Sequence, residues 1–224
     1  MTTFAAVTFR GWPPEAITFY EGLEADNSKA YWTAHKAVYD ECVRAPFEAL
    51  ADDVRDDVGD LRLFRPYRDV RFSKDKAPYK TAAAAAGELE DGALVYVQLS
   101  AAGLFVASGH YRPAPDQLER FRAAVADERS GAELESVVAG LRKAGYEFGG
   151  SELKVAPRGY PRDHPRVELL RHKGITAGRT FAPGKWLATP KAKDRVLDGW
   201  RGAAPLHRWL DRHDGPSTLP PEEP

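Results

Sequence analysis

The apolar residues of the N-terminal quarter of the chain recur at the spacing of a helix. After the proline pair at 13–14, a short helix is predicted over residues 15–24, because proline is tolerated in a first helical turn. Residues 26–28 supply N-cap side chains for a second helix, which Pro46 should break or kink. One face of this helix carries Tyr31, His35, Val38 and Cys42, and its continuation carries Phe47, Leu50, Val54 and Val58. Gly59 is the predicted end of the helical region.

Beyond Gly59 the pattern changes to short runs of β-type residues. Strands are predicted over residues 61–67, 79–89, 94–100 and 104–108. Turn residues at Asp91-Gly92 and at 101–103 would join the later strands into an antiparallel meander. Within the second strand, residues 81–86 are rich in alanine and favour a helix by intrinsic propensity, which opposes their assignment to a strand.

The C-terminal half returns mainly to helical spacing. Two amphipathic helices are marked by Leu118, Phe121 and Val125 and by Leu134, Val137, Val138 and Leu141, and the second should end at Gly145. Extended pieces near 153–156 and 176–181 are expected as edge strands, with a brief helix at 166–171 between them. A last helix, bent at Pro205, carries Val196, Leu197, Trp200, Trp209 and Leu210.

The whole pattern predicts an α+β fold, an antiparallel β-sheet covered by amphipathic helices. We expect a single domain over residues 1–214, followed by a disordered C-terminal tail at 215–224, which is rich in proline and poor in apolar residues. A domain of this size buries enough surface to need neither a disulfide nor a metal for stability. The one cysteine, Cys42, excludes an internal disulfide and an all-cysteine metal site.

The chain shows no targeting or membrane signal at the level of sequence. Its N-terminus lacks a basic start followed by a sustained apolar stretch, and no apolar run approaches the length of a membrane span. We therefore expect a cytoplasmic protein that makes no membrane contact. The formal net charge of -1 argues against nucleic-acid binding by bulk charge.

The near-neutral total conceals an uneven distribution of charge. Residues 15–60 contain 12 acidic and 4 basic side chains, whereas residues 65–80 contain 6 basic and 2 acidic ones. Residues 154–172 are again positive, with 5 basic and 2 acidic side chains. Either these parts neutralise one another in the fold, or the basic parts converge on a bound anion.

The densest basic stretch is RDVRFSKDKAPYK, residues 68–80. Arginine binds carboxylate or phosphate oxygens in pairs, lysine supplies a mobile charge, and Tyr79 adds a hydroxyl donor or a stacking face. The predicted anion-binding residues are Arg68, Arg71, Lys74, Lys76, Tyr79, Lys80 and Arg158. The alternative is a salt-bridge network that ties this stretch to the acidic helices.

A second candidate is Asp163-His164, which precedes Pro165. An imidazole beside a carboxylate could act as a general base, so His164 is the candidate catalytic residue. Equally, this segment could only form a turn, with Asp163 capping the helix that begins at Pro165. His35 is interpreted as a buried, hydrogen-bonded core residue. Zinc-site spacings, a phosphate-binding loop, a dinucleotide fingerprint and a serine hydrolase elbow are all absent, so neither a metal nor a cofactor is predicted.

Three blocks of the sequence resemble a bacterial family catalogued as a domain of unknown function, DUF2461. The blocks are FYEGLEADNSKAYWTAHKAVYDECVRAPFEAL (19–50), RDVRFSKDKAPYK (68–80) and LKVAPRGYPRDHPRVELLRHKGI (153–175). The alanine run after Lys80 replaces bulkier strand residues of the family. The resemblance implies an α+β domain and brings no established activity, cofactor or catalytic residue.

Several functions remain open at this level. The first is binding of a small phosphorylated or carboxylated ligand in a basic pocket built from the second and third blocks, with Tyr79 and His164 as orienting groups. A metal-independent hydrolase or transferase would use the same pocket, with His164 as the base. A protein-interaction module would instead present the acidic helical face of residues 40–60 to a partner that the sequence does not identify. Nucleic-acid binding ranks last. Whether any reaction is catalysed is left open.

Overall fold

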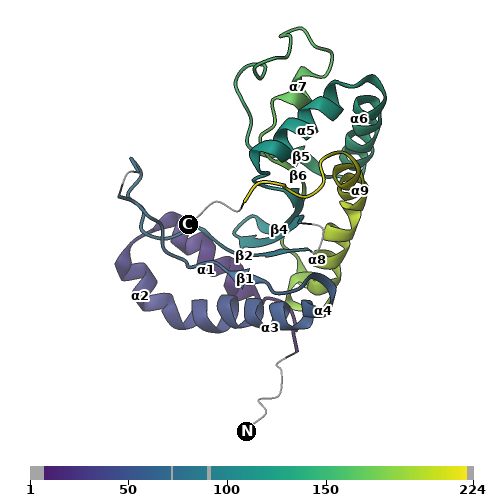
Figure 1. Cartoon of the computed structure of the whole chain (residues 1–224). Coiled ribbons are helices and arrows are strands. Elements are labelled where there is room, and N and C mark those ends of the chain that lie inside the picture. The colour runs from purple at the N-terminus through teal and green to yellow at the C-terminus, as the bar shows by residue number, and fades with distance from the viewer. Residues whose placement is uncertain (1–7, 72, 90–91, 221–224) are drawn as a thin grey trace. The chain divides into compact units, whose positions relative to one another are not determined.

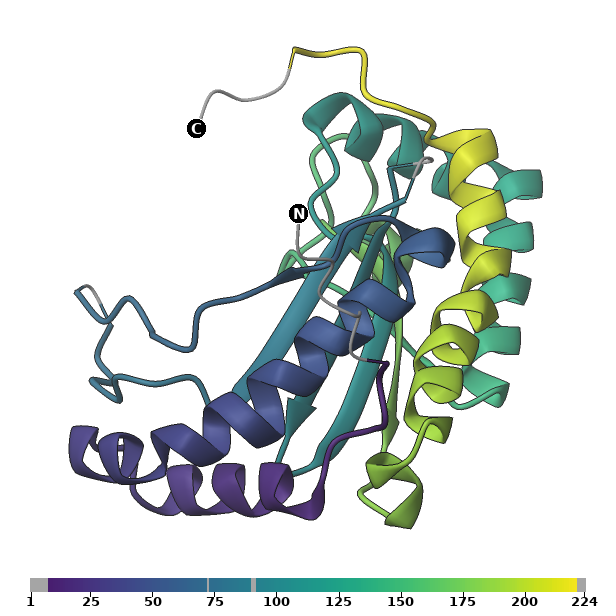
Figure 2. The ribbon, with the colours of Figure 1, turned by 90° about the horizontal axis from the view of Figure 1, so that it is seen from below.

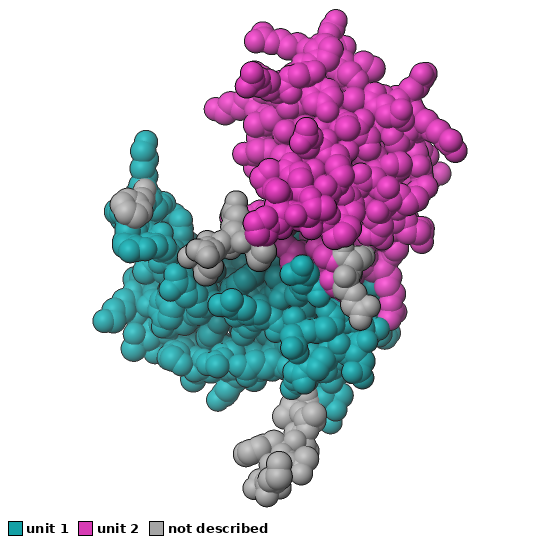
Figure 3. Space-filling view, in the orientation of Figure 1, with its two compact units in different colours: residues 1–88, 96–106, 180–198 teal, residues 89–95, 107–179, 199–224 magenta. Residues whose placement is uncertain are grey.

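A computed structural model describes residues 8–71, 73–89 and 92–220 (Figure 1). The chain forms two compact units, coloured separately in Figure 3. Unit 1 takes its residues from 1–88, 96–106 and 180–198, and unit 2 from 89–95, 107–179 and 199–224. The predicted limits of a single domain, 1–214, stay a prediction.

Helices make up most of the N-terminal part of unit 1. They are α1 (Pro14–Ala25), α2 (Lys29–Val38), a π-helical stretch (Tyr39–Arg44), α3 (Ala45–Asp53) and α4 (Arg55–Val58). Pro14 lies in the first turn of α1, and the Ser28 side chain caps α2 by accepting a hydrogen bond of 3.1 Å from the Tyr31 amide. After α4 the chain turns at Gly59, whose φ of 72° suits glycine. The sequence therefore predicted these helix ends correctly.

Pro46 widens the helix instead of breaking it. The π-helical stretch Tyr39–Arg44 leads directly into α3, and Pro46 lies in the first turn of α3. Proline lacks an amide hydrogen, and its ring clashes with the carbonyl four residues earlier, so a locally wider turn relieves both problems. The helical rod consequently runs on from α2 to α3, as Figure 2 shows.

The buried face of α2 differs from the predicted one. Trp32 and, in the π-helical stretch, Tyr39 and Val43 are buried, whereas Tyr31, His35, Val38 and Cys42 are half-buried. Burial of the Trp32 indole removes more apolar surface from water than burial of the Tyr31 ring would. The buried face is therefore shifted by one residue from the predicted one. His35 was interpreted as a buried, hydrogen-bonded core residue; the burial was wrong, and the hydrogen bond is present. Its Nδ1 lies 2.9 Å from the Tyr31 carbonyl, and its ring stacks on that of Tyr31.

A six-stranded antiparallel sheet has the order β1-β2-β3-β4-β6-β5. The strands are β1 (Arg62–Leu63), β2 (Ala82–Glu88), β3 (Leu94–Ser100), β4 (Gly103–His110), β5 (Glu147–Gly149) and β6 (Ile175–Phe181). The predicted α+β fold, with an antiparallel sheet and helices, is confirmed. Of the predicted Asp91-Gly92 turn, Asp91 lies outside the described residues, and Gly92 has a φ of 80°.

Three strand predictions need correction. The predicted strand 61–67 is only two residues long, because Pro66 cannot donate to the ladder, and pairing resumes only as a bridge between Tyr67 and Tyr79. Strand β6 lies between β4 and β5 and is not at an edge. Residues 153–156 form no strand, and next to them Glu152 makes an isolated bridge to His172.

The alanine run does form a strand, β2. Its register with β1 pairs Arg62 with Ala86 and Leu63 with Ala85. Backbone pairing within the sheet thus overrides the helical propensity of alanine, which is a weak preference.

Unit 2 is built around a second apolar core. Helices α5 (Pro115–Ala126), α6 (Glu128–Lys143), α7 (Val167–Leu170) and α9 (Ala204–His213) belong to it. Their core residues include Phe121, Val125, Leu134, Val138, Leu141, Leu170, Trp209 and Leu210. The predicted last helix is in fact two, α8 (Lys191–Gly202) and α9, because Pro205 begins a new helix in its first turn.

The C-terminal residues after α9 hydrogen-bond to α5. The Gly215 carbonyl accepts from Gln117, and Asp116 accepts from the Ser217 hydroxyl and the Thr218 amide, each at 2.8 Å. The predicted tail disorder at 215–224 stays a prediction, and residues 221–224 lie outside the described part. No helix in the described ranges is long and apolar enough to cross a membrane.

Candidate functional site

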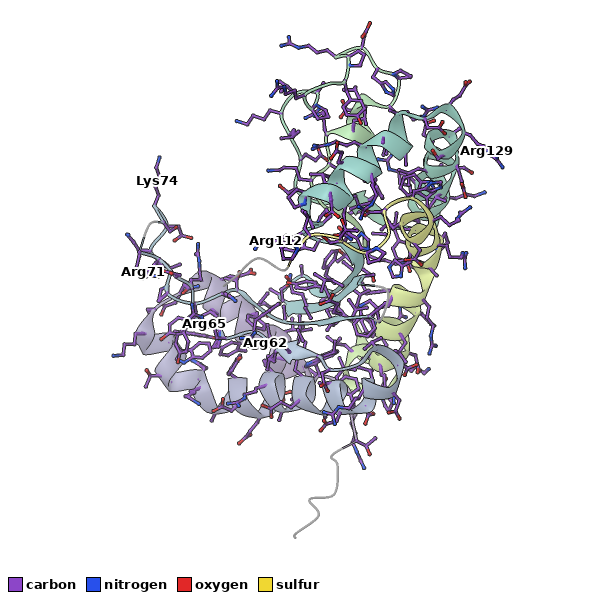
Figure 4. All side chains as sticks on the ribbon, viewed as in Figure 1. Arg62, Arg65, Arg71, Lys74, Arg112 and Arg129 are labelled. Atoms are coloured by element: carbon purple, nitrogen blue, oxygen red, sulfur yellow. The ribbon has the colours of Figure 1, made fainter. Side chains whose placement is uncertain are left out.

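The basic segment, residues 62–80, connects β1 to β2 in unit 1. Its outer end carries Arg71 and Lys74, and Arg65 and Arg62 lie progressively nearer the sheet (Figure 4). The segment contains seven basic side chains and two acidic ones, because Arg62 adds to the six of residues 65–80. These cations are therefore spread along the segment and do not meet at one point.

Asn27 fastens the base of the basic segment to the turn between α1 and α2. Its side-chain carbonyl accepts from the Tyr79 amide, and its amide nitrogen donates to the Tyr79 carbonyl, both at 3.1 Å. The ring of Tyr79 stacks on Trp32 with centroids 4.3 Å apart and planes 7° apart. These contacts hold one end of the segment in place.

Tyr79 is itself buried, with 6% of its surface exposed. Burial raises the pKa of its hydroxyl, and neighbouring Tyr67 raises it further. Because Trp32 covers one ring face, Tyr79 contributes more to the position of the segment than to an open stacking surface. Tyr67, which sequence reasoning passed over, is the exposed one of these two tyrosines.

The two aspartates of the segment neutralise two of its arginines. Arg68 lies 2.5 Å from Asp75, and Arg71 makes paired hydrogen bonds to the two oxygens of Asp69 at 3.0 and 2.7 Å. Hydrogen bonds from Arg71, and then the charge of Arg65, lower the pKa of Asp69. The pKa of Asp75 is lowered first by the Ala77 amide and then by Arg68. Both ion pairs are local to the segment, and both aspartates are exposed.

The other cations of the segment have no carboxylate at ion-pair distance among the described residues. Lys76 donates to the Val70 carbonyl at 3.0 Å, and the Lys80 ammonium lies 5.4 Å from the centre of the Phe64 ring. Neither Arg65 nor Lys74 has a hydrogen-bond or ion-pair partner within the same ranges. An excess of positive charge therefore remains on the surface of unit 1.

His164 and Arg158 belong to unit 2. His164 accepts a hydrogen bond of 3.0 Å from the Arg166 amide through Nδ1. Helix α7 begins at Val167, with Arg166 as its N-cap residue and no side-chain cap, so the prediction that Asp163 caps a helix beginning at Pro165 was wrong. Arg158 is exposed. Because the second and third blocks lie in different compact units, the pocket that they were predicted to share stays a prediction.

The arginines of the third block are largely satisfied within unit 2. The Arg166 side chain is only 10% exposed, pairs with Glu135 at 3.0 Å, and also donates to the carbonyls of Asp127 and Glu128. Gly131 permits this close approach, since a Cβ there would lie 2.8 Å from the guanidinium. Arg171 donates to the Leu153 carbonyl at 2.7 Å.

Unit 2 also contains a buried polar network that sequence reasoning missed. The Ser108 hydroxyl donates to the Leu94 carbonyl at 2.8 Å and lies 2.9 Å from His207 Nε2. His110 Nδ1 lies 2.7 Å from Asp214 Oδ2. Ser108 is 2% exposed and directs its proton to a carbonyl, so this arrangement suits structure better than nucleophilic attack. About a hundred residues separate the partners in sequence, so no local pattern could reveal them.

Metal and thiol chemistry find little support in the described ranges. No group of three or more His, Cys, Asp or Glu side chains among these residues is arranged to hold a metal ion. Cys42 is half-buried, and burial, followed by the charges of Glu15 and Glu41, raises the pKa of its thiol. A raised pKa lowers the fraction of reactive thiolate at neutral pH.

Comparisons with known proteins identify the family alone. No curated protein and no solved structure matches the chain. The family described as "Conserved hypothetical protein (DUF2461)" matches over residues 15–209, a range that includes the Asn27 turn, the basic segment and the Arg166 region. The chain therefore belongs to the DUF2461 family.

Proposed function

We propose that the basic segment of unit 1 binds a small phosphorylated or carboxylated ligand. The observation that carries this proposal is the local excess of cations, since both aspartates of the segment are already paired. Five cations of the segment have no carboxylate at ion-pair distance among the described residues: Arg62, Arg65, Lys74, Lys76 and Lys80. An anion that reaches them gains attraction without first breaking an ion pair.

The paired arginines are a second set of contacts for such a ligand. Arg71 presents Nε and an NH2 group side by side to Asp69, which is the geometry that also binds phosphate. Exposed ion pairs are only weakly stabilising, so a doubly charged phosphate competes well with the aspartate. The clamp between Asn27 and Tyr79 fixes one end of the segment before a ligand arrives, which reduces the ordering cost of binding.

A thermal-shift panel tests this proposal. Inorganic phosphate, citrate, sugar phosphates and nucleotides are titrated against the whole chain, because a ligand that binds the native state raises its melting temperature. At a concentration about 100 times the Kd, the expected stabilisation is about 2.7 kcal/mol. The double variant Arg65→Gln/Lys80→Gln should lose the shift.

The matched control is Arg129→Gln, since Arg129 is an exposed arginine of unit 2 and should be irrelevant to binding (Figure 4). Absence of any shift across the panel, or equal shifts in the double variant and the control, would exclude the segment as the binding site.

The two other functions remain hypotheses without a supporting contact. His164 already accepts from the Arg166 amide through Nδ1, so in the neutral ring the proton is on Nε2 and neither ring nitrogen is free to act as a general base. The acidic helical face of residues 40–60 is partly neutralised by its own neighbours, through the pairs Arg44–Glu48 and Arg55–Asp52. Anion binding at the basic segment is the better supported function.

A further inference from the structure

Unit 1 carries a row of three aromatic rings that begins within the basic segment. Phe64 directly follows β1, Tyr96 lies in β3 and Phe105 in β4. The Phe64 and Tyr96 centroids are 6.5 Å apart, and those of Tyr96 and Phe105 are 6.1 Å apart. Phe64 is 38% exposed, and the other two rings are half-buried. We call these residues the aromatic row.

The alanines of β2 make this row possible. β2 separates β1 from β3, and the Phe64 amide donates to the Ala84 carbonyl at 2.9 Å. Bulky side chains on β2 would stand between the rings, whereas methyl groups let Phe64 and Tyr96 approach each other. Along β3, Val95, Val97 and Leu99 are buried and the alternate residues are half-buried, so Tyr96 projects from the opposite face.

Cations border the aromatic row at its Phe64 end. The Lys80 ammonium lies over the Phe64 ring, and Arg62, two positions before Phe64 along an extended chain, projects from the same side. An exposed cation–π contact is weak, so a phosphate can readily draw Lys80 away from the ring. Phe64 would then be open for stacking.

The row also includes a polar group that could recognise the edge of a ring. The Tyr96 hydroxyl donates to the Gln98 side-chain carbonyl at 2.7 Å. This bond fixes the orientation of the Gln98 amide and leaves its NH2 group as a donor beside the rings. Flat rings, an amide donor and cations together match a heterocyclic base that carries a phosphate.

We infer that the aromatic row binds a free nucleotide, with its base stacked on Phe64 and Tyr96 and its phosphate held by Lys80 and Arg62. This inference rests on the proposed function and names the ligand class. Sugar phosphates and simple carboxylates would satisfy the cations and leave the rings unused. A long nucleic acid is disfavoured, because residues 15–60 of the same unit carry 12 acidic against 4 basic side chains.

Calorimetric titration with adenosine 5′-monophosphate and with ribose 5-phosphate tests the inference. Stacking of one base contributes about 1–3 kcal/mol, so the nucleotide should bind about tenfold or more tightly than the sugar phosphate. Phe64→Leu should lower nucleotide affinity about tenfold and leave ribose 5-phosphate affinity unchanged. Lys80→Gln should weaken both ligands.

The controls separate loss of stacking from loss of folding. Tyr111→Leu removes an exposed aromatic ring of unit 2 and should leave both affinities unchanged. Circular dichroism establishes that each variant is folded. If Phe64→Leu fails to fold, Tyr96→Phe replaces it: this variant keeps the ring, releases Gln98, and should alter the preference among the four nucleoside monophosphates.

The possible outcomes distinguish this inference from the proposed function. Equal affinities for nucleotide and ribose 5-phosphate, with no effect of Phe64→Leu, overturn the nucleotide inference and leave anion binding intact. No binding of either compound overturns both. If a single-stranded oligonucleotide binds more tightly than the mononucleotide and with a steep salt dependence, the ligand is a nucleic acid and the commitment to a free nucleotide is wrong.

Discussion

Arginines in the two basic stretches of this chain do different things. In unit 2, Arg166 is almost buried and binds a carboxylate and several backbone carbonyls. In unit 1, Arg65 is exposed and has no hydrogen-bond or ion-pair partner among the described residues. The sequence showed both stretches as dense positive charge. Burial and the number of acceptors, more than charge density, separate a structural arginine from one that is available to a ligand.

The largest expected loss of stability comes from replacing Arg166, the nearly buried arginine of unit 2. Arg166→Met should lower the free energy of unfolding by about 3 kcal/mol, because it leaves backbone carbonyls without their donor. Urea denaturation measures the loss. Arg129→Met, at an exposed position of α6, should stay within about 0.5 kcal/mol of the wild type. A similar small change for Arg166→Met would remove the distinction drawn between the two stretches.

A second prediction concerns the clamp at the base of the basic segment. Asn27→Ala should lower the free energy of unfolding by about 1–2 kcal/mol, because two hydrogen bonds to the Tyr79 backbone are lost. The freed segment should also be cleaved faster by trypsin at Lys74. Ser28→Ala serves as the comparison, since it removes the α2 cap without touching the segment. Equal cleavage rates in both variants would show that Asn27 does not hold the segment.

A third prediction concerns Asp116, a carboxylate of unit 2 that accepts several hydrogen bonds, as Arg166 donates several. Asp116 accepts hydrogen bonds first from the Thr218 amide and also from Ser217 and Arg120, which hold its pKa well below the usual range. A lowered folded-state pKa means that the stabilisation is present at neutral pH and is lost as the pH falls below about 4, where the unfolded chain takes up the proton. Asp116→Asn should therefore be less stable than the wild type at pH 7, and the difference should shrink towards pH 2.

The measurement for Asp116 is urea unfolding at several pH values. The control is Asp56→Asn, at an exposed position of α4, which should stay within about 0.5 kcal/mol of the wild type at pH 7. A difference between wild type and Asp116→Asn that is constant across the pH range would mean that its carboxylate charge has no stabilising role.

The smallest expected effect on stability lies in the basic segment itself. Arg71→Ala breaks an exposed ion pair with Asp69 and should leave the urea midpoint almost unchanged. Its affinity for phosphate should nevertheless fall, because a ligand contact and its bidentate geometry are lost. A large loss of stability, with unchanged phosphate affinity, would make Arg71 a structural residue like Arg166.

Local patterns predicted much of the fold. The N-cap at Ser28, the helix end at Gly59 and the hairpin strand Leu94–Ser100 depend on interactions within a few residues, so their sequence signals are sufficient. The buried face of α2 and the length of β1 depend on what packs or pairs against them. For α2 and β1 the sequence predicted a helix and a strand correctly, but it missed which face of the helix is buried and how short the strand is.

The candidate site shows the same division. Charge density is a property of composition, so the crowding of cations over residues 68–80 is visible in the sequence. The folded chain is needed to show that Asp69 and Asp75 are already paired, that Tyr79 is buried under Trp32, and that Phe64 lies beside Tyr96. These contacts depend on burial, loop geometry and strand order. The contacts of Tyr79 with Trp32 and of Phe64 with Tyr96 join residues far apart in the sequence, whereas the two ion pairs depend on how the loop folds back on itself.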